Sequence, residues 1–175
     1  MTVDEQDRTG PGAERPAPAR PVSPAPRFKA AVAVYLLLRR DDRVLLLRRA
    51  GSGVHDGELA LPAGHVDEGE DALSAAAREA AEELRVTVHR EDCRLALTGH
   101  SGPERPGDDP YVDLFFVADR WSGEPMIGEP DRCTELVWAP VQDLPEDVVP
   151  FVAEAVEAVT GGADPRLLLW HWPAT

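Results

Sequence analysis

Apolar segments separated by short polar ones dominate the chain from about residue 29 onward. Residues 29–40 and 44–50 are apolar except at their ends, and the polar segment DDR lies between them, which predicts two strands joined by a tight turn. Such continuous runs are typical of strands buried on both faces. Further strands are predicted at residues 59–61, 93–102, 111–121 and 133–141.

Two segments have the spacing of amphipathic helices. Residues 71–85 place Ala80 and Leu84 on one small apolar side of a helical wheel, and residues 147–159 have apolar positions at helical intervals. Strands that flank and interleave with two helices predict an α/β fold in which helices cover both faces of a mixed β-sheet. The apolar residues 167–172 close the chain.

The segment before residue 28 has a different composition. Residues 1–27 contain six prolines among Gly, Ala, Arg and Glu residues. Such a segment cannot bury enough apolar surface to offset the entropy lost on ordering. We therefore expect a disordered proline-rich tail at residues 1–27 and one domain at residues 28–175, which is long enough for a single hydrophobic core.

The balance of charges limits the kinds of ligand. The formal net charge is −14, and Lys29 is the only lysine. The surface should repel a nucleic-acid backbone, because binding one depends on Lys and Arg neutralising phosphates, so no nucleic-acid polymer is expected as a partner. A small phosphorylated ligand is compatible with the sequence if a metal cation supplies local positive charge.

Cysteine spacing and hydropathy exclude two further classes. Cys93 and Cys133 lie forty residues apart, which excludes a disulfide framework or a thiolate zinc site as the organising device and predicts two buried thiols. The longest apolar run, residues 30–38, has nine residues, far fewer than the ~20 that span a bilayer. Because acids and prolines stand where a signal peptide would be apolar, the sequence predicts a cytoplasmic protein with no membrane partner.

An acidic cluster lies on the predicted helix, opposite its apolar side: Glu79, Glu82 and Glu83. Like charges three and four residues apart repel by about a few tenths of a kcal/mol per pair, and on the wheel Arg78 points away from the other acids. Two interpretations remain, a solvated acidic face or a site for hard divalent cations, which prefer oxygen ligands. Gly64 favours the cation site, since a residue without a side chain lets the backbone come close to a ligand.

The spacing of these residues resembles the signature of the Nudix hydrolases. The matched positions are Gly64, Glu70 after five intervening residues, Arg78-Glu79 after seven more, and Glu82-Glu83 after a further two. Two positions depart from the family's pattern, because Ala80 stands where a bulky aliphatic residue is usual and Arg85 where the family has Gly. Glycine there resembles a left-handed helix C-cap, which a residue with a side chain enters at a cost of about 1 kcal/mol.

The resemblance implies a Nudix fold, an α/β/α sandwich with a mixed β-sheet between helices, and hydrolysis of a nucleoside diphosphate linked to another moiety. The ligands that it implies for Mg²⁺ or Mn²⁺ are the Gly64 carbonyl, Glu79, Glu82 and Glu83. By the same resemblance Arg78 would orient Glu79, and Glu70 would support the site from farther away.

Four residues outside the signature are further candidates. Asp108 and Asp109 lie where a loop carboxylate could act as general base or metal ligand, but GDDP is equally typical of an exposed turn. Arg48 and Arg49 end a predicted strand near which family members often contact phosphate. The alternative for these two is a solvated strand end.

The sequence does not identify the substrate. Trp138 and Phe151 could stack on a base or belong to the core, and His55 and His65 are expected to be ordinary loop residues beside the site. The candidate functions are hydrolysis of nucleoside triphosphates or related nucleoside diphosphate derivatives, hydrolysis of ADP-ribose, a nucleotide sugar or a prenyl diphosphate, and a non-catalytic ligand-binding module of the same fold. The intact acidic cluster argues against the last of these. A homodimer is compatible with the resemblance, since dimers are frequent among relatives.

Overall fold

The computed structural model describes residues 28–161 and 167–172, so the tail predicted at residues 1–27 lies outside the described residues. The elements are β1 (Ala31–Arg40), β2 (Arg43–Arg49), β3 (Leu59–Ala60), β4 (Ala63–His65), α1 (Ala72–Leu84), the 3₁₀ helix η1 (Arg90–Asp92), β5 (Cys93–Ser101), β6 (Tyr111–Ala118), β7 (Cys133–Pro140), α2 (Pro150–Thr160) and β8 (Leu167–Trp170). The predicted strands and both predicted helices are present. β4 and the strand β8 were not predicted.

The strands form a mixed sheet in the order β3-β2-β1-β6-β5-β8, with β4 paired to β1 and β7 paired to β2. β1 and β6 are parallel, as are β5 and β8, and the other pairs are antiparallel. β2 pairs with β1 only at Arg39 and Arg40, whereas β4 pairs with β1 at Ala33–Tyr35. β2 and β4 therefore pair with the same edge of β1, at different positions along it.

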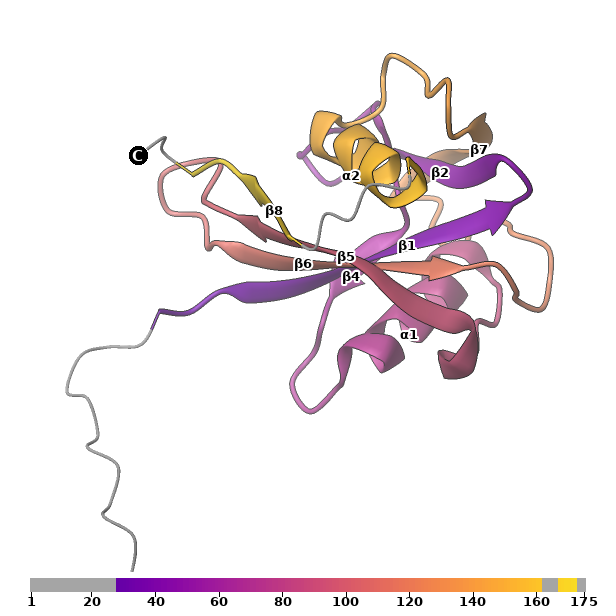
Figure 1. Cartoon of the computed structure of the whole chain (residues 1–175), viewed down its shortest axis with the longest axis horizontal. Helices are drawn as coiled ribbons and strands as arrows, with labels where there is room; N and C mark the ends of the chain where they lie inside the picture. Colours follow the sequence, from indigo (N-terminus) through magenta and orange to yellow (C-terminus); the bar gives the residue numbers. More distant parts are fainter. Residues whose placement is uncertain (1–27, 162–166, 173–175) are drawn as a thin grey trace, which may run out of the picture.

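The two helices cover opposite faces of the sheet (Figure 1). On one face α1 packs its buried alanines and Leu84 against apolar residues of β1 and β6 such as Leu36 and Phe116. On the other face α2 packs against Leu37 and Phe115. Alternate residues of β1 thus serve both cores, which is why its sequence is almost continuously apolar. The predicted α/β/α sandwich is confirmed.

Both ends of α1 are capped by specific contacts. The side chain of Asp71 accepts hydrogen bonds from the backbone N–H groups of Leu73 and Ser74, at 3.0 and 3.2 Å. At the other end Arg85 itself adopts the left-handed conformation, with φ 58° and ψ 26°, where the family signature has Gly. Its Nη2 donates to the carbonyl of Gly128 at 2.8 Å, so a hydrogen bond partly offsets the conformational cost.

Some boundaries and environments differ from the predictions. α2 begins at Pro150 rather than residue 147, because proline is favoured in the first turn of a helix, where its missing N–H is not needed. Both cysteines are free thiols, but only Cys133 is buried, while Cys93 is partly exposed. None of the helices within the described ranges is long and apolar enough to cross a membrane.

Candidate active site

A cavity of about 580 Å³ lies beside the edge of β1 that pairs with β2 and β4. Its walls come from β1, β2, β4, β6, α1 and three loops, which follow β2, join β5 to β6 and precede β7, and Phe151 of α2 also lines it. Of the residues predicted for the site, those that line it are Gly64, Glu79, Glu83, Arg49, Asp108 and Asp109. Glu70, Arg78 and Glu82 stand next to it, linked to Glu79 through the Arg78 side chain.

Glu79 and Glu83 lie on the side of α1 that faces the sheet, not opposite its apolar residues. The buried residues of α1 include Ala76 and Ala80, and on a helical wheel Glu79 and Glu83 fall on the same arc as these two. Glu82 lies at the edge of that arc, and its side chain is 49% exposed, against 13% for Glu79. The prediction of an acidic face opposite the apolar one is therefore wrong.

Gly64 is required by the position of Glu79. A Cβ built on Gly64 would collide with the Glu79 carboxylate, so the carboxylate lies directly over the backbone of β4. Gly64 pairs with Val34 in β1, which fixes this stretch of backbone against the sheet. The absence of a side chain at Gly64 thus brings the backbone of β4 and a carboxylate of α1 together.

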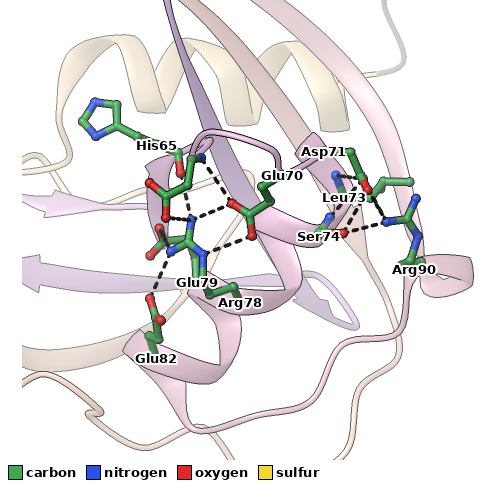
Figure 2. Close-up of polar contacts among 10 residues, drawn as sticks. His65, Glu70, Asp71, Leu73, Ser74, Arg78, Glu79, Glu82 and Arg90 are labelled. Atoms are coloured by element: carbon green, nitrogen blue, oxygen red, sulfur yellow. Dashed lines mark hydrogen bonds and ion pairs between the residues drawn. The ribbon is translucent and has the colours of Figure 1, made fainter.

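The Arg78 side chain forms hydrogen bonds with three of the acidic residues around α1 (Figure 2). Its Nη1 donates to Glu79 Oε1 at 2.6 Å and to Glu82 Oε2 at 3.0 Å. Its Nε and Nη2 donate to the two oxygens of Glu70, and Nη2 also donates to the carbonyl of His65. The expectation that Arg78 points away from the other acids is wrong, because its long side chain reaches Glu79 and Glu82.

The pKa values follow this arrangement. Hydrogen bonds from Arg78 hold the pKa of Glu70 below its usual value. Burial raises the pKa of Glu79, with Arg78 opposing the shift. Burial also raises the pKa of Glu83 to about 8, and the charge of Glu79 adds to the shift while a 3.0 Å hydrogen bond from Ala63 N–H opposes it. Arg78 therefore contacts Glu79 but not Glu83, on whose pKa the charge of Arg49 acts instead.

Glu129 is a site residue that the sequence did not indicate. It lines the cavity, and its charge raises the pKa of both Glu79 and Glu83. It lies in the loop that closes the C-terminus of α1, where the N–H of Gly128 donates to the carbonyl of Glu83 at 2.8 Å. No local pattern marks Glu129, because its place depends on how this loop packs against α1. Asp108 and Asp109 also line the cavity, from the exposed loop before β6.

The two arginines at the end of β2 have different surroundings. Arg49 lines the cavity and is held by the carbonyl of Val54 and the hydroxyl of Ser52, at 3.1 and 3.2 Å. Arg48 points to the other side of the strand, where it forms ion pairs with Glu135 and Asp147 at 2.7 and 2.6 Å. Arg48 therefore lies outside the cavity, and the prediction of a phosphate contact does not fit its position.

The two aromatic residues considered for stacking on a base also have different surroundings. Phe151 lines the cavity beside Tyr35, whose ring meets it edge-on at 5.7 Å. Trp138 instead stacks on Trp121 at 6.0 Å, with the guanidinium of Arg40 over its ring at 4.9 Å, and it does not line the cavity. Of the two stacking candidates, only Phe151 remains.

The two histidines expected to be ordinary loop residues both line the cavity. His65 stacks on Tyr111, with ring centroids 5.6 Å apart. His55 Nδ1 lies 2.5 Å from Glu58 Oε2. Both rings therefore have partners of their own within the protein.

The acidic cluster fits a hard divalent cation. Across residues 28–161 and 167–172, no three acidic, histidine or cysteine side chains already converge on one point, and Arg78 holds Glu79 and Glu82. Carboxylate oxygens are nevertheless the ligands that Mg²⁺ and Mn²⁺ prefer. Burial raises the pKa values of Glu79 and Glu83, and a nearby cation would favour their ionised forms.

Comparison with known proteins agrees with this geometry. Residues 27–159 match the NUDIX domain family. The crystal structure of a MutT NUDIX hydrolase from Burkholderia pseudomallei is 32% identical and superimposes with a TM-score of 0.68, over 75% of this chain and 99% of that one. A NUDIX hydrolase from Nitrosomonas europaea is 22% identical, with a TM-score of 0.64 over 83% of this chain and 81% of that one.

A more distant structure was solved with nucleotide and metal. It is a bifunctional NMN adenylyltransferase/ADP ribose pyrophosphatase from Francisella tularensis, complexed with AMP and a Mn ion. It is 18% identical, with a TM-score of 0.58 over 78% of this chain and 43% of that one, so it supports the fold alone. The chain belongs to the Nudix family. It is a Nudix hydrolase, a pyrophosphohydrolase of small diphosphate-containing substrates.

Proposed function

We propose that this enzyme hydrolyses the diphosphate linkage of nucleoside triphosphates or related nucleoside diphosphate derivatives with the help of Mg²⁺ or Mn²⁺. The observation that carries the proposal is the pair Glu79 and Glu83, two partly buried carboxylates whose pKa values are raised and which share a cavity. A fold gains nothing from burying acids together, whereas a site for a cation and a diphosphate does. We assign this function to a domain of residues 28–175.

The proposed metal ligands are Glu79, Glu82 and Glu83, with the carbonyl of Gly64 as a further ligand. Bound there, the cation would offset the charge of the diphosphate oxygens and promote attack of water at phosphorus. Arg78 is a positioning residue, because its 2.6 and 3.0 Å hydrogen bonds fix Glu79 and Glu82 relative to each other. Glu70 in turn fixes Arg78 through two hydrogen bonds.

Two further roles belong to residues outside α1. Arg49 projects into the cavity from the end of β2 and is the proposed contact for a substrate phosphate. Water attack forms one P–O bond and breaks another, the leaving phosphate keeps the electron pair, and a carboxylate takes the proton of the water. Glu129, Asp108 and Asp109 line the cavity and are the candidate bases. Glu129 is favoured, because its loop is docked on the turn of α1 that carries Glu83.

A phosphate-release screen with Mg²⁺, run with and without a coupled pyrophosphatase, tests the proposal. The panel contains the nucleoside triphosphates, 8-oxo-dGTP, ADP-ribose, UDP-glucose, dinucleoside polyphosphates and a prenyl diphosphate. We expect a nucleoside triphosphate to exceed the rest and Glu83→Gln to abolish its turnover. A preference for ADP-ribose, a nucleotide sugar or a prenyl diphosphate would replace the substrate class and keep the chemistry. Ligand binding without turnover of any compound would favour the non-catalytic module.

A further inference from the structure

A carboxylate is buried in the middle of the sheet, away from the acidic cluster. Asp113 on β6 is 2% exposed and is the only charged side chain among the described residues that is fully buried. Its neighbours across the sheet are Ala33 on β1 and Gly99 on β5. An apolar residue at this position would be more favourable for the fold alone, because burying a carboxylate costs free energy even when hydrogen bonds partly compensate it.

Among the described residues, the hydrogen-bond partner of the Asp113 carboxylate is a single hydroxyl group. The hydroxyl of Ser101 donates to its Oδ2, and in the part of the chain that the structure describes no arginine or lysine contacts it. A carboxylate has about four acceptor positions, so Asp113 can accept further hydrogen bonds from a group in the cavity that it lines. Burial raises its pKa, although the Ser101 hydroxyl and the nearby His100 and His171 oppose the shift.

Asp113 faces the same cavity as the acidic cluster. Both Asp113 and Ser101 line it, as does Tyr35, whose pKa is raised by burial and then by the charge of Asp113. Tyr35 stacks on Phe115 at 4.6 Å, and Phe115 belongs to the core on the α2 side of the sheet. Glu79 reaches the cavity from α1, on the opposite side. The cavity therefore joins a cluster suited to metal and phosphate with a second polar group, Asp113, set among aromatic rings.

The aromatic rings near Asp113 indicate which part of a substrate would bind in this part of the cavity. Phe151 and Tyr111 line the cavity with Tyr35, and flat aromatic surfaces favour a planar ring system such as a nucleobase. An ionised carboxylate such as that of Asp113 accepts hydrogen bonds and donates none. A base that presents amino or ring N–H groups matches it, and a base edge that presents only acceptors does not.

We propose that Asp113 is a specificity-determining residue that binds N–H donors of the substrate's nucleobase, with Ser101 orienting its carboxylate. This inference rests on the proposed nucleotide hydrolysis, because it assigns the non-phosphate half of the same substrate. A binding site that relies on a buried carboxylate rejects analogues without the donor, since the carboxylate is then left desolvated and unpaired.

Two pairs of nucleotides that differ by a single amino group test the proposal. GTP and ITP differ in the 2-amino group, and ATP and purine riboside triphosphate differ in the 6-amino group. For at least one pair we expect the wild type to prefer the amino-bearing member by about 10- to 100-fold in kcat/KM, the size of one hydrogen bond to a charged group. Asp113→Asn should reduce that preference to within about threefold. Asp119→Asn, an exposed aspartate just after β6, is the control and should keep the wild-type ratio.

Binding measurements separate this inference from the proposed function. Calorimetry with GMP and IMP, and with AMP and purine riboside monophosphate, needs no turnover, so a preference that Asp113→Asn removes supports the base contact even if hydrolysis is absent. Turnover with unchanged ratios in Asp113→Asn would overturn the inference and leave the hydrolase proposal intact. A preference between GTP and dGTP that Asp113→Asn removes, with the amino-group ratios unchanged, would assign Asp113 to a sugar hydroxyl and also overturn it.

Folding of the variants is checked in the same samples. Asp113→Asn should keep or raise the melting temperature, because it removes a buried charge. Ser101→Ala gives a second test in which the carboxylate remains. We expect it to weaken the amino-group preference by a smaller factor than Asp113→Asn. If Ser101→Ala and Asp113→Asn lower kcat/KM for all nucleotides equally, their role is structural and the inference fails.

Discussion

Glu83 occupies the most constrained carboxylate position of the acidic cluster. It lies on the sheet-facing side of α1, its Oε2 accepts a 3.0 Å hydrogen bond from Ala63 N–H, and burial raises its pKa to about 8. Its partner Glu79 is held over Gly64, where no side chain intervenes. The site therefore depends on the positions of the Glu79 and Glu83 carboxylates.

Glu83→Gln should abolish activity without unfolding the protein. Glutamine keeps an oxygen that can accept from Ala63 N–H but loses the negative charge needed for a cation, so we expect turnover of the best substrate to fall at least about 100-fold. The melting temperature without metal should stay equal or rise, since a buried like charge is removed. Glu91→Gln, at an exposed glutamate of η1, is the control. Activity of Glu83→Gln within threefold of wild type would refute the metal assignment.

Gly64→Ala should move Glu79 rather than disturb β4. The backbone at Gly64 is ordinary extended strand, but a methyl group there would collide with the Glu79 carboxylate. The carboxylate must then leave its place beside Arg78, and we expect Mg²⁺ affinity measured by calorimetry to fall about 10- to 100-fold. Circular dichroism should show an unchanged secondary structure. Unchanged affinity would mean that Glu79 can bind metal from a different rotamer.

At the scale of elements, α1 is the support for the site, and its ends are fixed by contacts from elsewhere in the chain. The carboxylate of Asp71 caps its N-terminus and also pairs with Arg90 at 2.7 Å (Figure 2). At the C-terminus, the N–H groups of Met126 and Gly128 donate to the carbonyls of Leu84 and Glu83. The loop that carries Glu129 is thereby docked on the turn that carries Glu83. This explains how a left-handed Arg85 replaces the usual glycine without loss of the helix end.

The N-terminal cap gives a pH-dependent prediction. The Arg90 guanidinium, followed by the Ser74 hydroxyl, lowers the pKa of Asp71 to about 2. Because the folded-state pKa lies below the ordinary value of 3.8, the charge of Asp71 stabilises the fold above about pH 4, and that contribution is lost as the pH falls toward 2. Asp71→Asn retains an acceptor for the N–H groups of Leu73 and Ser74 but cannot ionise.

Thermal unfolding followed by circular dichroism at pH 3 to 7 measures this contribution. The melting temperature of Asp71→Asn should lie below that of wild type at pH 5 to 7, and the gap should narrow as the pH falls below 4. Asp143→Asn, at an exposed aspartate outside the helix, is the control. A gap that stays constant down to pH 3 would show that the charge of Asp71 does not stabilise the helix.

At the scale of the whole molecule, the sequence predicted the strands and helices that have long apolar patterns and the site residues that lie at fixed spacings. β1, β2, β6, both helices and the Nudix signature are local patterns, and the structure contains each of them. β4 has three residues and no apolar pattern, so only its pairing with β1 defines it. The contacts of Arg78 depend on a flexible side chain, which a helical wheel does not represent. Asp113 and Glu129 become site residues only after distant loops and strands pack together.

A divalent cation should stabilise the fold by specific binding, in addition to the general effect of salt on a highly charged molecule. With a formal net charge of −14, any salt reduces self-repulsion, so a general increase in melting temperature with ionic strength is expected. Specific binding adds to this by mass action. At Mg²⁺ concentrations about 100 times the dissociation constant it contributes about 2.7 kcal/mol, or roughly 5 to 10 °C for a domain of this size.

The experiment compares melting temperatures in MgCl₂ and in NaCl of equal ionic strength. Wild type should melt several degrees higher in MgCl₂, and the double variant Glu79→Gln/Glu83→Gln should show no difference between the salts. The double variant should also melt higher than wild type when both are free of metal, because the repulsion between two partly buried acids is gone. An equal rise for wild type in both salts would mean that Mg²⁺ acts by screening alone. The acids of α1 would then have been buried together for a reason other than metal binding.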